Sequence, residues 1–102
     1  MMKRDFMAAL KERVLVLDGA MGTMLQERGL KPGQSPEEMN LTMPDVVAAI
    51  HREYLDAGAD IIVTNSFGGS REKLSHYGLE GRLTEINAAS VQIAKKVAGD
   101  KA

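Results

Sequence analysis

The chain has 102 residues, 44% of them hydrophobic and 26% charged, and a formal net charge of −1 at pH 7, a composition typical of one small globular domain and not of a disordered chain. Lys and Arg are scattered among acidic residues, which argues against a nucleic-acid partner, and no apolar run approaches the roughly 20 residues of a membrane span. Cysteine is absent, so disulfides and thiolate metal sites are excluded within these residues.

The first predicted element is a short helix over residues 4–13, in which Phe6 and Leu10 lie four positions apart on one side. We expect this helix to cover the bottom of the sheet that follows it. The N-terminus leads into a mixed amphipathic segment rather than a signal-peptide core, so the sequence favours a cytoplasmic location.

A short apolar run at residues 14–17 leads directly into Asp18 and a turn bracketed by glycines. A continuous apolar run ended by turn residues is typical of a buried parallel strand. We expect a short helix over 23–28, ended by Gly29, and then an irregular loop over 30–39. Because functional groups collect at the carboxyl ends of parallel strands, Asp18 is the first candidate site residue.

The most regular pattern predicts a helix that begins at Pro44 and ends at Gly58. Proline costs little in the first turn, because its missing N–H would be unpaired there. A stripe with three- and four-residue spacing is expected to face the core: Val46 or Val47, Ile50, Tyr54 and Ala57. His51 stands among charged neighbours and is predicted to lie on the surface.

A second apolar run with a β-branched centre, at residues 60–64, predicts a second strand. It also ends in polar and glycine-rich residues, at 65–70. Ser70 is expected to cap a helix over 71–77 that Gly78 closes.

The last predicted helix is capped by Thr84 and closed by Gly99. Its expected buried stripe is Ile86, Ala89 or Ser90, Ile93 and Val97. The resulting βαβα order places the chain in the α/β class, with parallel strands joined by right-handed crossovers. Two strands cannot bury both faces of a parallel sheet, and a TIM (β/α)8 barrel typically needs about 250 residues. We therefore expect residues 1–102 to be a single partial domain, about a quarter of such a barrel, with an N-terminal capping helix.

These motifs resemble the N-terminal part of the homocysteine S-methyltransferase family. The matching stretches are residues 17–23 (LDGAMGT), 44–47 (PDVV), 54–60 (YLDAGAD) and 64–67 (TNSF). The similarity runs from about residue 13 to the end and is greatest to the homocysteine-binding barrel of the cobalamin-dependent methionine synthases. Where the family commonly has a second Thr in the last motif, this chain has Ser66, which keeps the hydroxyl group.

The resemblance implies a parent enzyme that transfers a methyl group to the zinc-activated thiolate of homocysteine and so makes methionine. Methyltetrahydrofolate acting through cobalamin is the implied donor, while betaine- and S-methylmethionine-type donors stay open. In the family, zinc is held by cysteines on later strands, and this chain has no cysteine. The chain is therefore expected to be a fragment that binds neither zinc nor cobalamin and has no turnover alone.

The resemblance also implies that Asp18 faces the barrel mouth and accepts a hydrogen bond from the ammonium group of homocysteine. A turn aspartate that binds nearby backbone N–H groups is the alternative. Gly19 would allow a close approach of the backbone. Three residues at the end of the second strand are expected to join Asp18 around one pocket, either holding the amino-acid end of the substrate or bracing the loop: Thr64, Asn65 and Ser66. Phe67 is interpreted as a packing residue.

A second class of function is left open, that of a non-catalytic α/β module. A quarter barrel would expose two sheet edges and apolar helix surface, which favours pairing with the remainder of the barrel or with another copy of the chain. An aldolase-like barrel that uses Asp18 as a base has no supporting lysine at a strand end. The glycines of residues 19–22 lack the lysine and the spacing of a phosphate-binding P-loop.

Overall fold

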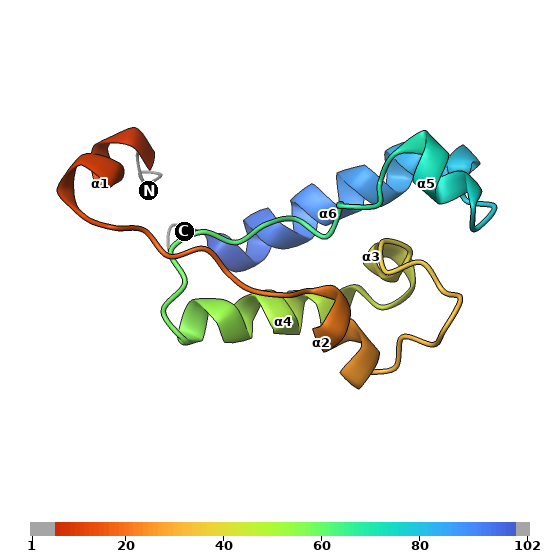
Figure 1. The fold of residues 1–102 in the computed structure, drawn as a ribbon, viewed down its shortest axis with the longest axis horizontal. Coiled ribbons are helices and arrows are strands. Elements are labelled where there is room, and N and C mark those ends of the chain that lie inside the picture. Colours follow the sequence, from red (N-terminus) through yellow and green to blue (C-terminus); the bar gives the residue numbers. More distant parts are fainter. Residues whose placement is uncertain (1–5, 100–102) are drawn as a thin grey trace.

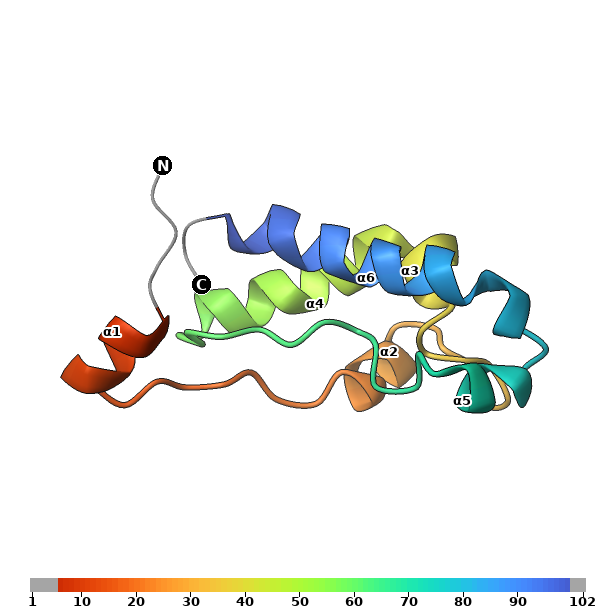
Figure 2. The same cartoon turned by 90° about the horizontal axis from the view of Figure 1, so that it is seen from above.

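The computed structural model describes residues 6–99, which form a layer of helices and two extended segments (Figure 1). The helices are α1 (Phe6–Glu12), α2 (Gly22–Glu27), α3 (Met39–Thr42), α4 (Pro44–Asp56), α5 (Arg71–Ser75), the 3-10 helix η1 (Glu80–Arg82) and α6 (Leu83–Ala98). The first extended segment covers residues 14–20 and the second covers residues 59–64. Both run along one face of the α4–α6 pair (Figure 2).

The two predicted strands are present as extended backbone that pairs at a single parallel bridge, between Leu17 and Ile61. The N–H groups of Asp60 and Ile61 donate to the carbonyl of Val16 at 2.8 and 3.2 Å. The N–H of Asp18 donates to the carbonyl of Ile61 at 2.9 Å. The parallel direction agrees with the prediction, whereas regular strands do not form within residues 6–99. Within residues 6–99 each extended segment pairs with the other alone, at this one bridge.

An ion pair joins the N-terminal ends of the two extended segments, away from the Asp18 turn. The guanidinium of Arg13 donates to both carboxylate oxygens of Asp60, at 3.0 and 2.8 Å. Oδ2 of Asp60 also accepts the backbone N–H of Val16 at 3.0 Å. This bidentate geometry fixes the alignment of the two segments as well as adding attraction.

The core lies between the helices. Its buried apolar side chains form two clusters, one of Leu25, Met39, Val47 and Ile50 and one of Leu74, Leu79 and Ile86. Full burial of such a side chain contributes about 1.5–3 kcal/mol. Helices α4 and α6 pack against each other, and the other core residues come from α2, α3, α5 and the segment before η1.

The helix ends follow the glycine pattern of the sequence. Gly29 and Gly58 have φ angles of 114° and 109°, a conformation that glycine adopts without strain. The N–H of Ala59, just past Gly58, donates to the carbonyl of Tyr54 at 3.0 Å and closes the end of α4. Ser70 caps α5 as predicted, because its hydroxyl accepts the N–H of Lys73 at 3.2 Å.

Three local predictions are wrong. α1 contains no buried residue, and Phe6 and Leu10 are exposed, so this helix covers no sheet within the described part of the chain. α6 begins at Leu83, directly after η1, so Thr84 is its second residue and not its cap. Ala57 is exposed because it follows the last residue of α4, although Val47 and Ile50 of the same predicted stripe are buried.

The prediction that His51 lies on the surface is also wrong. This residue is 0% exposed, on the same side of α4 as Val47 and Ile50. α4 is covered by α6 on one side and lies along the extended segments on another, so its buried face is wider than a single stripe. None of the helices in residues 6–99 is long and apolar enough to cross a membrane.

Candidate functional site

A cleft of about 510 Å³ lies where the two extended segments end. Its walls come from the turn at residues 18–23, from residues 63–67 and from Pro36 and Glu37 in the loop before α3. The five residues singled out by the sequence all line it: Asp18, Gly19, Thr64, Asn65 and Ser66. The structure therefore brings the two motifs to one place, as the shared direction of the segments requires.

Asp18 connects the two extended segments through its side chain. Its Oδ2 atom accepts the backbone N–H of Val63 at 3.0 Å. This is a contact to a backbone N–H, as in the structural alternative, although the partner belongs to the other extended segment. Among residues 6–99, Oδ1 of Asp18 has no hydrogen-bond partner, which leaves acceptor capacity at the cleft.

Gly19 packs directly on Tyr54. A Cβ atom at position 19 would lie 3.0 Å from the Tyr54 hydroxyl oxygen and 3.2 Å from its Cε1. The same hydroxyl donates to the carbonyl of Ala20 at 2.6 Å. The close backbone approach that the sequence suggests for Gly19 is thus used to seat the turn on α4.

The residues at the end of the second extended segment divide into two kinds. The hydroxyl groups of Thr64 and Ser66 form one hydrogen bond with each other, with their oxygens 2.6 Å apart. Either hydroxyl can be the donor. Asn65 is buried, and its amide donates to the carbonyl of Pro36 at 2.9 Å and to Oδ1 of Asn40 at 3.0 Å. These contacts brace the turn against the loop before α3, which is one of the two roles left open for this group.

Glu37 is the site residue that the sequence did not indicate. It is 6% exposed, yet it lines the cleft. Its Oε2 accepts the N–H of Gly68 at 3.0 Å, and its Oε1 accepts the hydroxyl of Ser35 at 3.2 Å. A Cβ atom at Gly68 would lie 2.7 Å from Oε1, so glycine is needed for this contact. The loop over 30–39 gave no spacing signal that could have identified Glu37.

Phe67 is 91% exposed, so its interpretation as a packing residue is wrong. The ammonium nitrogen of Lys73 lies 4.1 Å from the centre of its ring, in a cation–π contact. Phe67 lines the cleft and also a neighbouring pocket of about 310 Å³, together with Lys73, His76 and Tyr77. The turn that carries Phe67 is thus the wall between two pockets.

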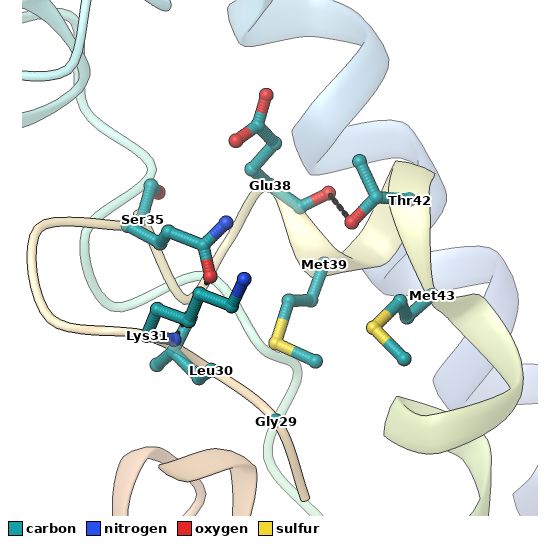
Figure 3. Close-up of a pocket in the computed structure, with 9 residues that line it drawn as sticks. Gly29, Leu30, Lys31, Ser35, Glu38, Met39, Thr42 and Met43 are labelled. Atoms are coloured by element: carbon teal, nitrogen blue, oxygen red, sulfur yellow. Dashed lines mark hydrogen bonds between the residues drawn. The ribbon is translucent and has the colours of Figure 1, made fainter.

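A further pocket, of about 260 Å³, lies between residues 29–35 and α3 (Figure 3). Met39 and Met43 lie on its α3 side, across from Leu30. The hydroxyl of Thr42 donates to the carbonyl of Glu38 within α3, at 3.4 Å. None of the residues predicted for the site lines this pocket.

His51 is an electrostatic feature of the helical layer near the site. Neither ring nitrogen has a hydrogen-bond partner among the described residues. Burial lowers the pKa of His51 below its ordinary value of 6.5, and the carboxylate of Asp18 acts in the opposite direction. The neutral imidazole is therefore the favoured form in the folded chain.

The residues of this chain do not fit a zinc site. No cysteine is present in the sequence, and residues 6–99 contain no group of three His, Cys, Asp or Glu side chains arranged to hold a metal ion. Structural and catalytic zinc sites need three or four such ligands.

Comparison with known proteins gives consistent matches over most of the chain. The family model described as homocysteine S-methyltransferase matches residues 15–102. The methionine synthases of Mycobacterium leprae (strain TN) and Mycobacterium tuberculosis (strain ATCC 25618 / H37Rv) are 38% and 39% identical over 104 residues, covering 94% of this chain. The chain spans only 8% and 9% of the length of these two relatives.

A solved structure also matches. The metallated form of the homocysteine methyltransferase MmuM from Escherichia coli aligns with a TM-score of 0.77 and 28% sequence identity. The alignment covers 90% of this chain and 33% of that protein.

Proposed function

Because the chain belongs to the homocysteine S-methyltransferase family, we propose that its cleft holds the amino-acid end of homocysteine in a parent enzyme that methylates this substrate to methionine. The observation that carries the proposal is the meeting of Asp18, Thr64 and Ser66 at one cleft. The names of the similar proteins, methionine synthase and homocysteine methyltransferase, support the same substrate.

Each polar group of the cleft has a role in this proposal. The free carboxylate oxygen of Asp18 accepts a hydrogen bond from the substrate ammonium, a charge-assisted contact. Thr64 and Ser66 are hydrogen-bonded to each other, so the hydroxyl that accepts in that bond keeps its own proton and donates it to the substrate carboxylate. Gly19 keeps the first turn close to Tyr54, and Asn65 holds the second turn against the loop before α3.

We further propose that residues 1–102 are the N-terminal βαβα portion, about a quarter, of a TIM (β/α)8 barrel. The parallel bridge between the extended segments and the likeness to one third of a homocysteine methyltransferase support this assignment. Large apolar side chains along the extended segments are exposed: Val14, Val16, Leu17 and Val63. In the parent they would be covered by the remainder of the barrel, which is the partner we assign to this surface.

The cofactors of the parent lie, in this proposal, outside the chain. A zinc ion held by other parts of the parent would lower the pKa of the homocysteine thiol and so favour the nucleophilic thiolate. Its ligands, and the cobalamin and methyltetrahydrofolate of the methionine-synthase branch, would be held by other parts of the parent. The chain by itself is then a substrate-holding fragment without turnover.

Calorimetric titration of the chain with homocysteine tests the substrate assignment. We expect Asp18→Asn to weaken binding about tenfold, because it removes a charge while keeping an acceptor for the N–H of Val63. Asp45→Asn, which changes an exposed carboxylate in the first turn of α4, is the matched control and leaves binding unchanged. Equal binding by the wild type and Asp18→Asn would contradict the assignment.

Zinc uptake tests the fragment assignment. With zinc and homocysteine added, we expect the chain to take up no stoichiometric zinc, since it has no cysteine and residues 6–99 hold no cluster of zinc ligands. Tight one-to-one uptake with deprotonation of the thiol would show that the chain is more than a substrate-holding fragment.

A further inference from the structure

Glu37 is a buried carboxyl group that lines a pocket together with Lys73 but forms no ion pair with it. It is 6% exposed, and both of its hydrogen-bond donors, the Ser35 hydroxyl and the Gly68 N–H, are neutral. None of the ion pairs within residues 6–99 involves it. Carboxylates are rarely buried this far without a cationic partner, because removing the charge from water is costly.

Bracing the turn at residues 66–69 does not explain why position 37 is charged. Neutral side-chain amides already hold neighbouring backbone groups in place. Asn65 holds the carbonyl of Pro36, and Asn87 donates to the carbonyl of Gly69 at 2.7 Å. A glutamine at position 37 could accept the Gly68 N–H through its carbonyl oxygen and donate its amide to the Ser35 hydroxyl, so both contacts can be made without a charge. The negative charge is therefore surplus to the bracing role.

The carboxylate of Glu37 also has acceptor capacity to spare. Each of its oxygens receives one hydrogen bond from the protein, and an ionised carboxylate offers about four acceptor positions. Glu37 lines the cleft that Asp18 lines, from the opposite loop. The cleft thus has carboxylates on two of its walls, which favours a positively charged group between them.

We propose that Glu37 is a second ligand-binding carboxylate of the cleft and, with Asp18, selects ligands that carry an ammonium group. The identity of that ligand as homocysteine rests on the function proposed above. The selectivity itself rests on the burial of Glu37, its neutral protein partners and its place in the cleft wall.

The test uses the full chain labelled with ¹⁵N and two ligands that differ only in the ammonium group, homocysteine and 4-mercaptobutanoate. The amide signal of Gly68 reports on the neighbourhood of Glu37. We expect Glu37→Gln to weaken homocysteine about tenfold, as loss of one charge-assisted hydrogen bond implies, and to leave 4-mercaptobutanoate unchanged. Glu38→Gln is the matched control, since Glu38 lies next to Glu37 but lines a different pocket (Figure 3).

A third probe, n-propylammonium chloride, separates this inference from the proposed function. In one outcome, homocysteine does not bind while n-propylammonium shifts the Gly68 signal in the wild type and not in Glu37→Gln. In that case the ligand-binding role of Glu37 is supported and homocysteine is the wrong ligand. If Glu37→Gln binds homocysteine as tightly as the wild type does, the role of Glu37 is overturned and the substrate assignment survives. If none of the ammonium probes moves the Gly68 signal in the wild type, the role of Glu37 is overturned, and the calorimetric titration with homocysteine decides the substrate assignment separately.

Discussion

Helix α4 and the extended segments of this chain differ in the burial of their apolar side chains. On α4, Val47 and Ile50 are fully buried between neighbouring helices. On the extended segments, Val16 and Val63 are each 54% exposed, although their sequence runs are the most apolar in the chain. The candidate site lies at the ends of the extended segments and not within α4.

The difference indicates that stability and ligand contact are assigned to separate parts of the chain. The helical layer has its partners within the chain and forms a closed core. The extended segments have one neighbour each and expose the face that further strands would cover. Polar links, chiefly those of Asn40 and Asn65, connect the helical layer to the site. Substitutions in the two regions should therefore differ in size and in kind.

The largest expected effect is that of Ile50→Ala in the helical core. Removing this fully buried side chain should lower the free energy of unfolding by about 2–5 kcal/mol, because a cavity is left among rigid neighbours. Val16→Ala, on an exposed part of the extended segment, should change it by less than about 0.5 kcal/mol. Urea denaturation followed by circular dichroism measures both. Similar losses for the two variants would remove the distinction between the regions.

Asn40→Ala tests the link between the two regions. The Asn40 amide donates to the carbonyls of Asn65 and Ile86 at 2.9 and 3.3 Å, and these acceptors would be left buried. We expect a loss of about 1–3 kcal/mol in the free energy of unfolding, from unsatisfied buried groups. Thr42→Ala on the exposed side of α3 is the control. Stability equal to that of the control would mean that the link is not structural.

A smaller effect should appear in the pH dependence of stability, through His51. Its pKa in the folded chain is lowered, so the unfolded chain binds the additional proton. Stability is then fully present above the unfolded pKa, about 6.5, and falls as the pH decreases through the window down to the folded pKa, by at most about 1.4 kcal/mol per pH unit.

Urea denaturation at several pH values between 5 and 8 measures this effect. His51→Leu should remove this part of the slope, because no buried imidazole is left to protonate. His76→Gln changes an exposed histidine and should keep the wild-type profile. An unchanged slope in His51→Leu would show that another group controls the acid sensitivity.

The smallest change in stability, less than about 0.5 kcal/mol, is expected for Val16→Lys, since the side chain is exposed in the single chain. Its effect should be on association. The exposed apolar face favours pairing of two copies, and a lysine on that face opposes it. Sedimentation velocity over a concentration series should show the wild type associating more strongly than Val16→Lys. Val91→Lys, on α6, is the matched control, and a wild type that stays monomeric would contradict the expectation.

The sequence predicted the parts of the fold that local patterns determine. The limits of α4 follow from Pro44 and Gly58, and Ser70 caps α5 as its position suggests. The gathering of Asp18 and Ser66 at one cleft was also predictable, because both follow runs that pair in parallel. These features depend on short stretches and on one rule about parallel segments.

The remaining features depend on contacts between distant parts of the chain. His51 is buried because α4 is covered on two sides, whereas a periodic pattern assumes one buried face. Glu37 enters the site through a hydrogen bond to Gly68, 31 positions away, for which no local pattern exists. The predicted strands lack the second neighbours that would extend their ladders. Phe67 was misjudged because an aromatic residue in a turn gives no indication of what covers it.

The Arg13–Asp60 ion pair has a consequence for the order in which the molecule assembles. Its partners are 47 positions apart, and closing a loop of that length costs about 3 kcal/mol of chain entropy. Helices form within about a microsecond from local contacts, and so do not wait for this closure. We expect the extended segments to join last and to separate first, so that Arg13→Ala speeds unfolding and leaves the refolding rate nearly unchanged. The site is then completed only in the final step of folding.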